Sequence, residues 1–206
     1  MELMYATPKS WAPAVLQAPL LLLNDHAHLE KKAANNALEL LSRWPHGNIP
    51  ERWVRGLAGV ARDETLHLKQ VSSLLLQKGG QLSRNHRNSY AGHLHNLVRR
   101  GAGHAELIDR LLIAALIEAR SCERFELLQH HTDDESLRRL YGGLMAAERG
   151  HYKLFLELAD LLQPDTAQTR WMELLACEAR IMAAEPFEMR LLSGAPGDLQ
   201  MPHVEK

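Results

Sequence analysis

The chain has 206 residues, and its 24 Lys and Arg against 25 Asp and Glu leave a formal net charge of −1 at pH 7. This balance excludes a polycation, so any nucleic-acid surface must be a local patch. A composition rich in Leu, Ala and Glu, with only 5 % aromatic residues, favours an all-helical fold, and the length fits one domain over residues 1–206.

Helical periodicity of apolar residues appears in five places along the chain. It predicts helices over about residues 14–42, 50–78 and 104–130, a fourth that begins after Asp133 or Asp134 and ends at about 162, and a fifth over about 166–184. Pro19 leaves the start of the first helix open, and the pair Gly79-Gly80 stops the second. Asp133 or Asp134 caps the fourth. We therefore expect a four-helix bundle over about 14–163, an additional C-terminal helix at 166–184 and an irregular tail at 193–206.

The connection between the second and third predicted helices, residues 81–103, has a different character. It contains no Asp or Glu, and a short helix is expected over 89–100. It carries four arginines, Arg84, Arg87, Arg99 and Arg100. These side chains suit the phosphates of an RNA backbone and Tyr90 could stack on a base, although an ordinary solvated loop is the alternative. A long crossover of this kind divides the bundle into two helical hairpins.

Each of the four bundle helices carries one glutamate on its otherwise apolar, inward-facing line. In the second and fourth helices, a histidine follows that glutamate three residues later. The resulting candidate ligands are Glu30, Glu64, His67, Glu118, Glu148 and His151. The two hairpins thus repeat one pattern, in which a lone glutamate is followed about one helix later by a Glu-x-x-His pair.

Carboxylates at one level of an apolar core are costly to bury and repel one another unless cations neutralise them. Four glutamate anions balance two divalent cations, and two neutral imidazoles add ligands without adding charge. The pattern therefore predicts a two-metal centre, with small neighbours such as Ala114 leaving room for dioxygen or substrate. The alternative, that these residues lie on solvated helix faces, is less consistent with six of them in register on four helices.

Other polar residues lie near these candidates in the sequence. Four of them are expected on the polar outer face of the first helix: His26, His28, Lys31 and Lys32. The alternative is RNA contact for the two lysines and a role at the site for the two histidines. Glu178 is expected in a surface or capping position, with a role beside the metals as its alternative. Asp25 and Asp63 are candidates to form hydrogen bonds with the metal ligands without binding the metals themselves. The two cysteines, Cys122 and Cys177, form no disulfide framework or thiolate metal motif and are expected to be buried thiols.

Three segments carry a resemblance to a known family. DHAHLEKKA at 25–33, ARDETLHL at 61–68 and MAAERGHYKLF at 145–155 resemble the ferritin-like di-iron carboxylate superfamily. More closely, they resemble the bacterial tRNA hydroxylases that act on 2-methylthio-N6-isopentenyladenosine next to the anticodon. The likeness extends over about residues 11–192 and includes the basic crossover.

The resemblance implies an O2-dependent monooxygenase in which two iron ions support hydroxylation of the isopentenyl group. It implies that Glu64 and Glu148 bridge the irons, whereas the other four candidate ligands are terminal. The partners it implies are a tRNA carrying the prenylated adenosine and a separate reductase that supplies two electrons. No stretch is long enough to span a bilayer, so we expect a cytoplasmic protein without a membrane partner.

Other functions remain open on the residues alone. An iron-storage or ferroxidase protein of the ferritin type would use the same ligands. So would another small-molecule di-metal oxidase or a di-manganese catalase, because the ligand set admits both iron and manganese. The basic crossover and the lack of an obvious acidic path for iron argue against storage. The buried carboxylates argue against a metal-free helical scaffold.

Overall fold

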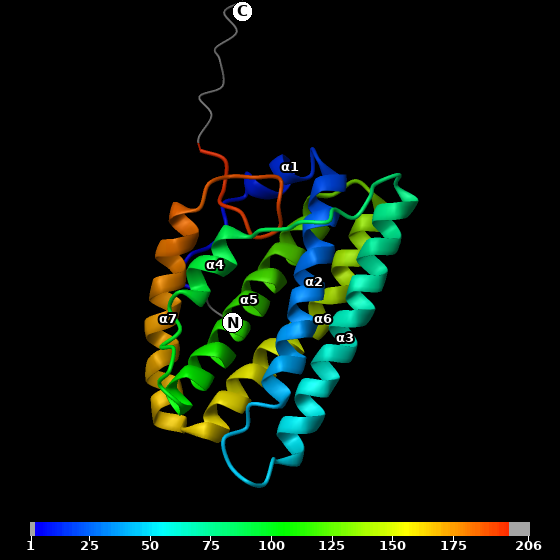
Figure 1. Ribbon diagram of the computed structural model, residues 1–206. Coiled ribbons are helices and arrows are strands. Elements are labelled where there is room, and N and C mark those ends of the chain that lie inside the picture. Colours follow the sequence, from blue (N-terminus) through cyan, green and yellow to red (C-terminus); the bar gives the residue numbers. More distant parts are fainter. Residues whose placement is uncertain (1–2, 198–206) are drawn as a thin grey trace, which may run out of the picture.

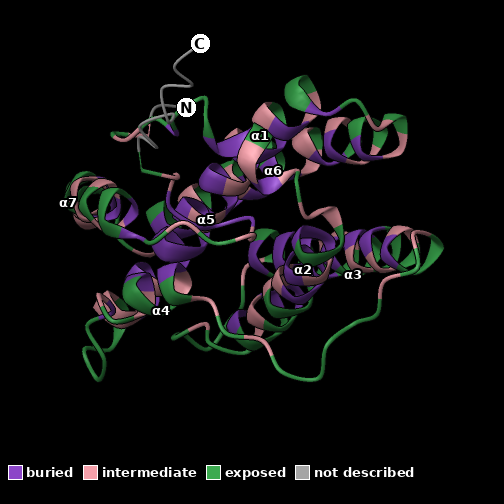
Figure 2. Cartoon of the chain, turned by 90° about the horizontal axis from the view of Figure 1, so that it is seen from above, coloured by how far each residue is buried: buried purple, intermediate pink, exposed green. Residues whose placement is uncertain are grey.

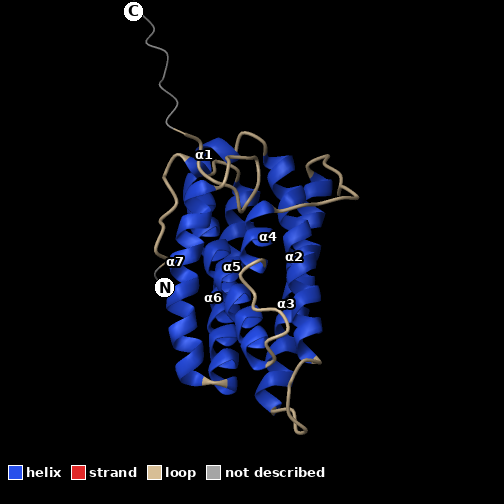
Figure 3. Ribbon diagram, turned by 60° about the vertical axis from the view of Figure 1, so that its left-hand side comes forward, coloured by secondary structure: helices blue, strands red, loops and turns tan. Residues whose placement is uncertain are grey.

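The computed structural model describes residues 3–197, and the regular secondary structure within them is entirely helical (Figures 1 and 3). The helices are α1 (Trp11–Val15), α2 (Pro19–Leu41), α3 (Glu51–Gln77), α4 (Ser89–His95), α5 (His104–His131), α6 (Glu135–Leu162) and α7 (Pro164–Ala184). The predicted all-helical bundle with an additional C-terminal helix is confirmed. Within residues 3–197, no helix combines the length and the apolar character needed to cross a membrane. Of the predicted irregular tail, residues 193–197 form no helix and 198–206 lie outside the described residues.

The bundle consists of two helical hairpins. α2 packs chiefly against α3 and α5 chiefly against α6, and contacts between α3 and α6 join the two hairpins. The crossover leaves the end of α3, passes over one end of the bundle and descends on its outside to the start of α5 (Figure 1). The apolar lines of the four long helices face one another and form one hydrophobic core. This arrangement places the middle of each helix, where its glutamate lies, at the centre of the protein.

The first predicted helix is divided into two. α1 ends at Val15, and α2 begins with Pro19 as its first residue. Proline suits this position because it has no N–H to satisfy there and its φ angle is already helical. The predicted start at residue 14 was therefore wrong, and the break redirects the chain so that Trp11 is fully buried.

The predicted signals at two other helix ends are confirmed. Gly79 adopts a φ of +82° beyond the end of α3, in the left-handed region that favours glycine. Asp134 caps α6 by accepting hydrogen bonds from the backbone N–H groups of Ser136 (2.9 Å) and Leu137 (3.2 Å). A cap of this kind stabilises a helix by about 1 kcal/mol. The short crossover helix ends earlier than expected, at His95 rather than near residue 100.

α4 and α7 form an outer layer against α5 (Figure 2). Beyond α7, residues 185–194 turn back over the end of the bundle, where Leu191 is buried and its N–H donates to Asp25 Oδ2 at 2.9 Å. Gly194 allows this return because a Cβ there would lie 1.7 Å from the Glu185 carbonyl oxygen. The C-terminal segment therefore anchors the start of α2.

A buried ionic network joins α4, α5 and α7. Arg120 Nη2 donates to both carboxylate oxygens of Glu178, at 2.7 and 2.9 Å, and Tyr90 Oη donates to Glu178 Oε1 at 2.9 Å. All three side chains are fully buried. The prediction of a surface or capping Glu178 was wrong, because α7 turns this residue toward α5. Tyr90 lies in the core, where it cannot stack on a base.

Candidate metal centre

The four long helices bring the six candidate ligands to one level of the bundle. Each helix contributes its inward-facing residues: Glu30 from α2, Glu64 and His67 from α3, Glu118 from α5, and Glu148 and His151 from α6. A step of three residues keeps the glutamate and histidine of each pair on one helix face. All six are between 1 % and 6 % exposed. The alternative of solvated helix faces is therefore excluded.

The six side chains form two overlapping groups. Glu30, Glu64, His67 and Glu148 make up one group, and Glu64, Glu118, Glu148 and His151 the other. Within each group, one potential ligand atom from every residue lies within 4.8 Å of the others. Glu64 and Glu148 belong to both groups, and the imidazole rings of His67 and His151 lie 5.9 Å apart. The arrangement can hold two metal ions side by side with two carboxylates between them.

The contacts inside the cluster fit metal ligands better than hydrogen-bond partners. His151 Nδ1 lies 2.7 Å from Glu64 Oε1, and His67 Nδ1 lies 3.1 Å from Glu148 Oε1. None of these four atoms is in hydrogen-bonding geometry with any residue of 3–197. Buried polar atoms without a partner are costly. These nitrogen and oxygen atoms therefore fit a pair of cations that would accept their lone pairs.

In the protein alone, the cluster binds protons. Burial raises the pKa of Glu64 to about 8 and that of Glu118 well above its usual value. Burial opposes a charged imidazole, but the neighbouring carboxylates outweigh it and raise the pKa of His67 to about 12 and of His151 to about 10. Metal ligands must be deprotonated, so divalent cations would replace these protons.

One residue beside the cluster was expected on the outer face instead. His26 is fully buried, and its Nε2 contacts the carboxylate of Glu30 one helical turn further along α2. Its ring stacks on Tyr141 at 5.7 Å between centroids and lies 5.0 Å from Phe125. The expectation of a polar-face His26 was wrong. Its spacing of four residues from Glu30 was the signal that could have identified it.

Of the two aspartates predicted near the ligands, one lies beside them and the other does not. Asp63 Oδ2 lies 3.5 Å from His151 Nε2, without hydrogen-bonding geometry. Asp25 instead contacts His86 Nε2 at 2.6 Å, and the His86 ring stacks on His28 at 4.8 Å. Asp25 therefore anchors the crossover and the C-terminal segment to α2 and touches no candidate ligand. His28 was expected on a polar outer face, but the crossover covers it.

The four arginines predicted to contact RNA differ in their surroundings. Arg99 donates two side-chain hydrogen bonds to the buried carboxylate of Asp109, at 2.9 and 2.7 Å, so it contributes to the fold. Arg84, Arg87 and Arg100 are exposed. Lys31 and Lys32 are exposed as expected, Cys122 is buried as expected, and Cys177 is only partly buried.

Two hairpins joined by a long crossover, with a buried carboxylate and imidazole cluster able to hold metal, define a ferritin-like protein. A solved structure from Synechococcus, described as Protein 43 with aldehyde deformylating oxygenase activity, has the same fold. Its TM-score is 0.85 at 30 % identity, covering 96 % of this chain and 98 % of that one. A model of the family tRNA-(MS[2]IO[6]A)-hydroxylase (MiaE) matches residues 2–193. The chain belongs to this family, as the resemblance of its segments predicted.

Two relatives carry the name tRNA 2-(methylsulfanyl)-N(6)-isopentenyladenosine(37) hydroxylase. The protein from Pseudomonas putida is 37 % identical over 191 residues, which cover 92 % of this chain and 91 % of the relative. The protein from Salmonella typhimurium is 38 % identical over 90 residues, covering 44 % of this chain and 33 % of the relative. Both names describe a hydroxylase that acts on a prenylated tRNA nucleoside.

Proposed function

We propose that this protein is a di-iron, O2-dependent monooxygenase that hydroxylates the isopentenyl group of 2-methylthio-N6-isopentenyladenosine next to the anticodon of tRNA. The observation that carries the proposal is the pair of overlapping ligand groups that share Glu64 and Glu148. Family membership and the names of the two relatives support the nucleoside substrate. Iron is favoured over manganese by this relationship, since both metals suit the ligand set.

Each ligand has a proposed role that follows from its place in the cluster. Glu64 and Glu148 would be shared by the two ions because each belongs to both groups. Glu30 and His67 would complete the site of one ion, and Glu118 and His151 the site of the other. The bound iron pair supplies the activation of dioxygen for insertion of one oxygen atom into a C–H bond.

The surrounding residues keep this centre dry and fixed. Apolar side chains above and below the ligands on each helix, such as Val60 and Phe155, exclude water from the bundle core. Insertion of one oxygen atom and release of the other as water consumes two electrons from outside the substrate. A separate reductase is therefore part of the proposal, and a cytoplasmic location stays a prediction of the sequence.

The test is a single-turnover assay with the purified protein. Protein loaded with Fe(II) and given a chemical reductant and O2 is expected to add one oxygen atom to the prenylated nucleoside of tRNA, measured by mass spectrometry of the digested nucleosides. Unmodified tRNA is the matched control, and Glu148→Ala is the inactive variant. Mineralisation of iron without reaction on tRNA would favour the storage alternative. Because the structural relative is described as an aldehyde deformylating oxygenase, an aldehyde is the second substrate to assay. Turnover of the aldehyde without any reaction on tRNA would contradict the proposal.

A further inference from the structure

Two cavities lie along one continuous face of α2. The first is bordered by Asn24 and Asp25 of α2, and the second by Lys32 and Ala33 about two turns further along the same face. The crossover covers both, with Arg87 at the first cavity and Ala91 at the second. Eight residues of helix separate the two positions on α2, or about 12 Å along its axis. Buried His28, with the His86 ring stacked on it, lies between these positions, so the two cavities are separate hollows on one side of α2.

The second cavity is narrow and apolar and reaches the metal centre. Its volume is about 80 Å³, and its walls include Ala33 of α2, Ala91 of α4 and Ala114 and Ile117 of α5. Glu118, one of the six candidate ligands, also lines it. Because a single water needs roughly 10–15 Å³ of such space, this cavity admits a short branched hydrocarbon but is narrow for a purine. Its apolar walls favour burial of such a group.

The rim of this narrow cavity is polar and basic. Lys32 and His95 line it, and Lys32 is exposed to solvent. Burial lowers the pKa of His95, and the positive charges of Arg110 and Arg100 lower it further. The positive charges of Lys32, Arg100 and Arg110 lie near the opening, where they would attract a negatively charged polymer.

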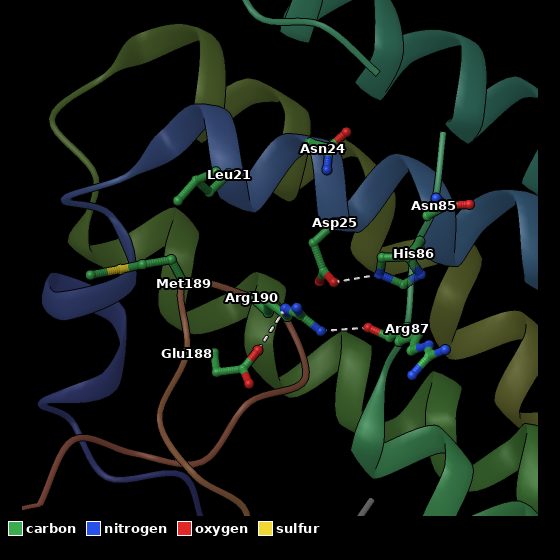
Figure 4. Close-up of a pocket in the computed structure, with 9 residues that line it drawn as sticks. All are labelled: Leu21, Asn24, Asp25, Asn85, His86, Arg87, Glu188, Met189 and Arg190. Atoms are coloured by element: carbon green, nitrogen blue, oxygen red, sulfur yellow. Dashed lines mark hydrogen bonds and ion pairs between the residues drawn. The ribbon is translucent and has the colours of Figure 1, made fainter. Parts of the chain in front are cut away.

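The first cavity is wider and polar (Figure 4). Its volume is about 410 Å³, and its lining includes His86, Arg87 and Arg190. Arg190 donates to the backbone carbonyl oxygen of Arg87 and pairs with Glu188. Within residues 3–197 the Arg87 guanidinium itself has no hydrogen-bond partner. It is exposed and available to a phosphate, which arginine binds through two parallel hydrogen bonds.

We propose that this face of α2 and the crossover binds the single-stranded loop of the RNA substrate, with the prenyl group in the narrow cavity and a neighbouring phosphate at Arg87. This inference rests on the proposed function and specifies its substrate site. RNA loops are recognised with their bases unstacked and splayed out, which would present a prenyl group to a cavity too narrow for the base. The cavity walls then select the hydrocarbon, and Lys32 and Arg87 hold the backbone.

The narrow cavity is tested by filling it. Ala91→Leu and Ala33→Leu add bulk from two different helices, and Ala58→Leu on the exposed face of α3 is the matched control. Each cavity variant is expected to lower kcat/KM for the prenylated anticodon stem-loop at least tenfold, while its metal content and its Kd for the unprenylated stem-loop match the wild type. Turnover equal to that of the control in both variants would overturn the assignment.

The phosphate contacts are tested by charge reversal. Lys32→Glu and Arg87→Glu are each expected to weaken binding of the stem-loop about tenfold and to reduce the slope of log K against log salt by about 1. Arg139→Glu is the control, because its side chain is 72 % exposed on α6. Affinities equal to that of the control would overturn the assignment of this RNA-binding face. Binding is measured without turnover, so an inactive wild type would count against the proposed function and leave this test decisive for the RNA-binding face.

Discussion

His26 Nε2 contacts the carboxylate of Glu30 one turn away on α2, inside the bundle. Burial lowers the pKa of His26 to about 4, so its imidazole is neutral at pH 7 and can donate one N–H to the carboxylate. The rings of Phe125 and Tyr141 pack against it and hold its orientation. His26 is therefore a positioning residue for Glu30, since hydrogen bonds to a metal ligand fix that ligand's direction.

Removing this contact should weaken metal binding without removing a ligand. His26→Ala is expected to lower the affinity for Fe(II) or Co(II) by 10- to 100-fold, the range typical of residues that hydrogen-bond to ligands. Titration followed by the metal's absorption measures it. His131→Ala, an exposed histidine at the end of α5, is the control. Equal affinities for the two variants would show that His26 has no part in orienting Glu30.

The two kinds of ligand should differ in metal stoichiometry. Glu64 belongs to both ligand groups and Glu30 to only one. Glu64→Ala is therefore expected to lose both ions. Glu30→Ala is expected to keep one ion and to hold the other more weakly. Metal analysis after dialysis measures this, with the exposed Glu51→Ala as the control. Two ions retained by Glu64→Ala would contradict the bridging role.

The buried ion pair between Arg120 and Glu178 should matter for stability far more than a surface pair. Glu178→Ala leaves the Arg120 guanidinium charged and less well paired in the core, which typically costs about 3–5 kcal/mol. Glu173→Ala on the same helix breaks an exposed pair with Arg170 and should cost less than about 1 kcal/mol. Urea unfolding of both variants measures the difference. Similar losses would mean that the network contributes little.

Stability should fall in acid partly through Asp109. Burial would raise the pKa of Asp109, but hydrogen bonds from Arg99 and Arg170 outweigh it and hold that pKa below its ordinary value of 3.8. A carboxylate with a lowered folded pKa contributes stability that is complete above the unfolded pKa and is lost as pH falls through the folded one. The advantage of the wild type over Asp109→Asn should therefore be constant near neutrality and shrink below about pH 4.

Unfolding free energies measured at several pH values between about 3 and 7 test this dependence. Asp133→Asn, at an exposed aspartate before α6, is the control and should follow the wild type over the whole range. If the stability advantage of the wild type over Asp109→Asn grew in acid, the lowered pKa of Asp109 that we attribute to Arg99 and Arg170 would be contradicted.

The convergence of the six candidate ligands was predictable because helical periodicity determines which side chains face a bundle axis. A polar residue at the middle of an otherwise apolar line, as at Glu118, indicates a site whatever the neighbouring helix is. Glu178 shares a buried line with Leu174 on α7, but it was assigned to the surface because its partner Arg120 lies on α5, which the sequence of α7 does not reveal. Tyr90 was also misplaced, because its crossover helix is too short to show a reliable period.

The sequence by itself determined the helices and the residues on their inward-facing lines. It also determined a candidate ligand set whose negative charge balances two divalent cations. These features depend on local spacing and residue chemistry. Only the tertiary structure decided which carboxylates both ligand groups share, that His26 contacts Glu30, and that the crossover lies over one face of α2. These features depend on how helices distant in the chain pack together, and a three-residue step along one helix contains no information about its partner.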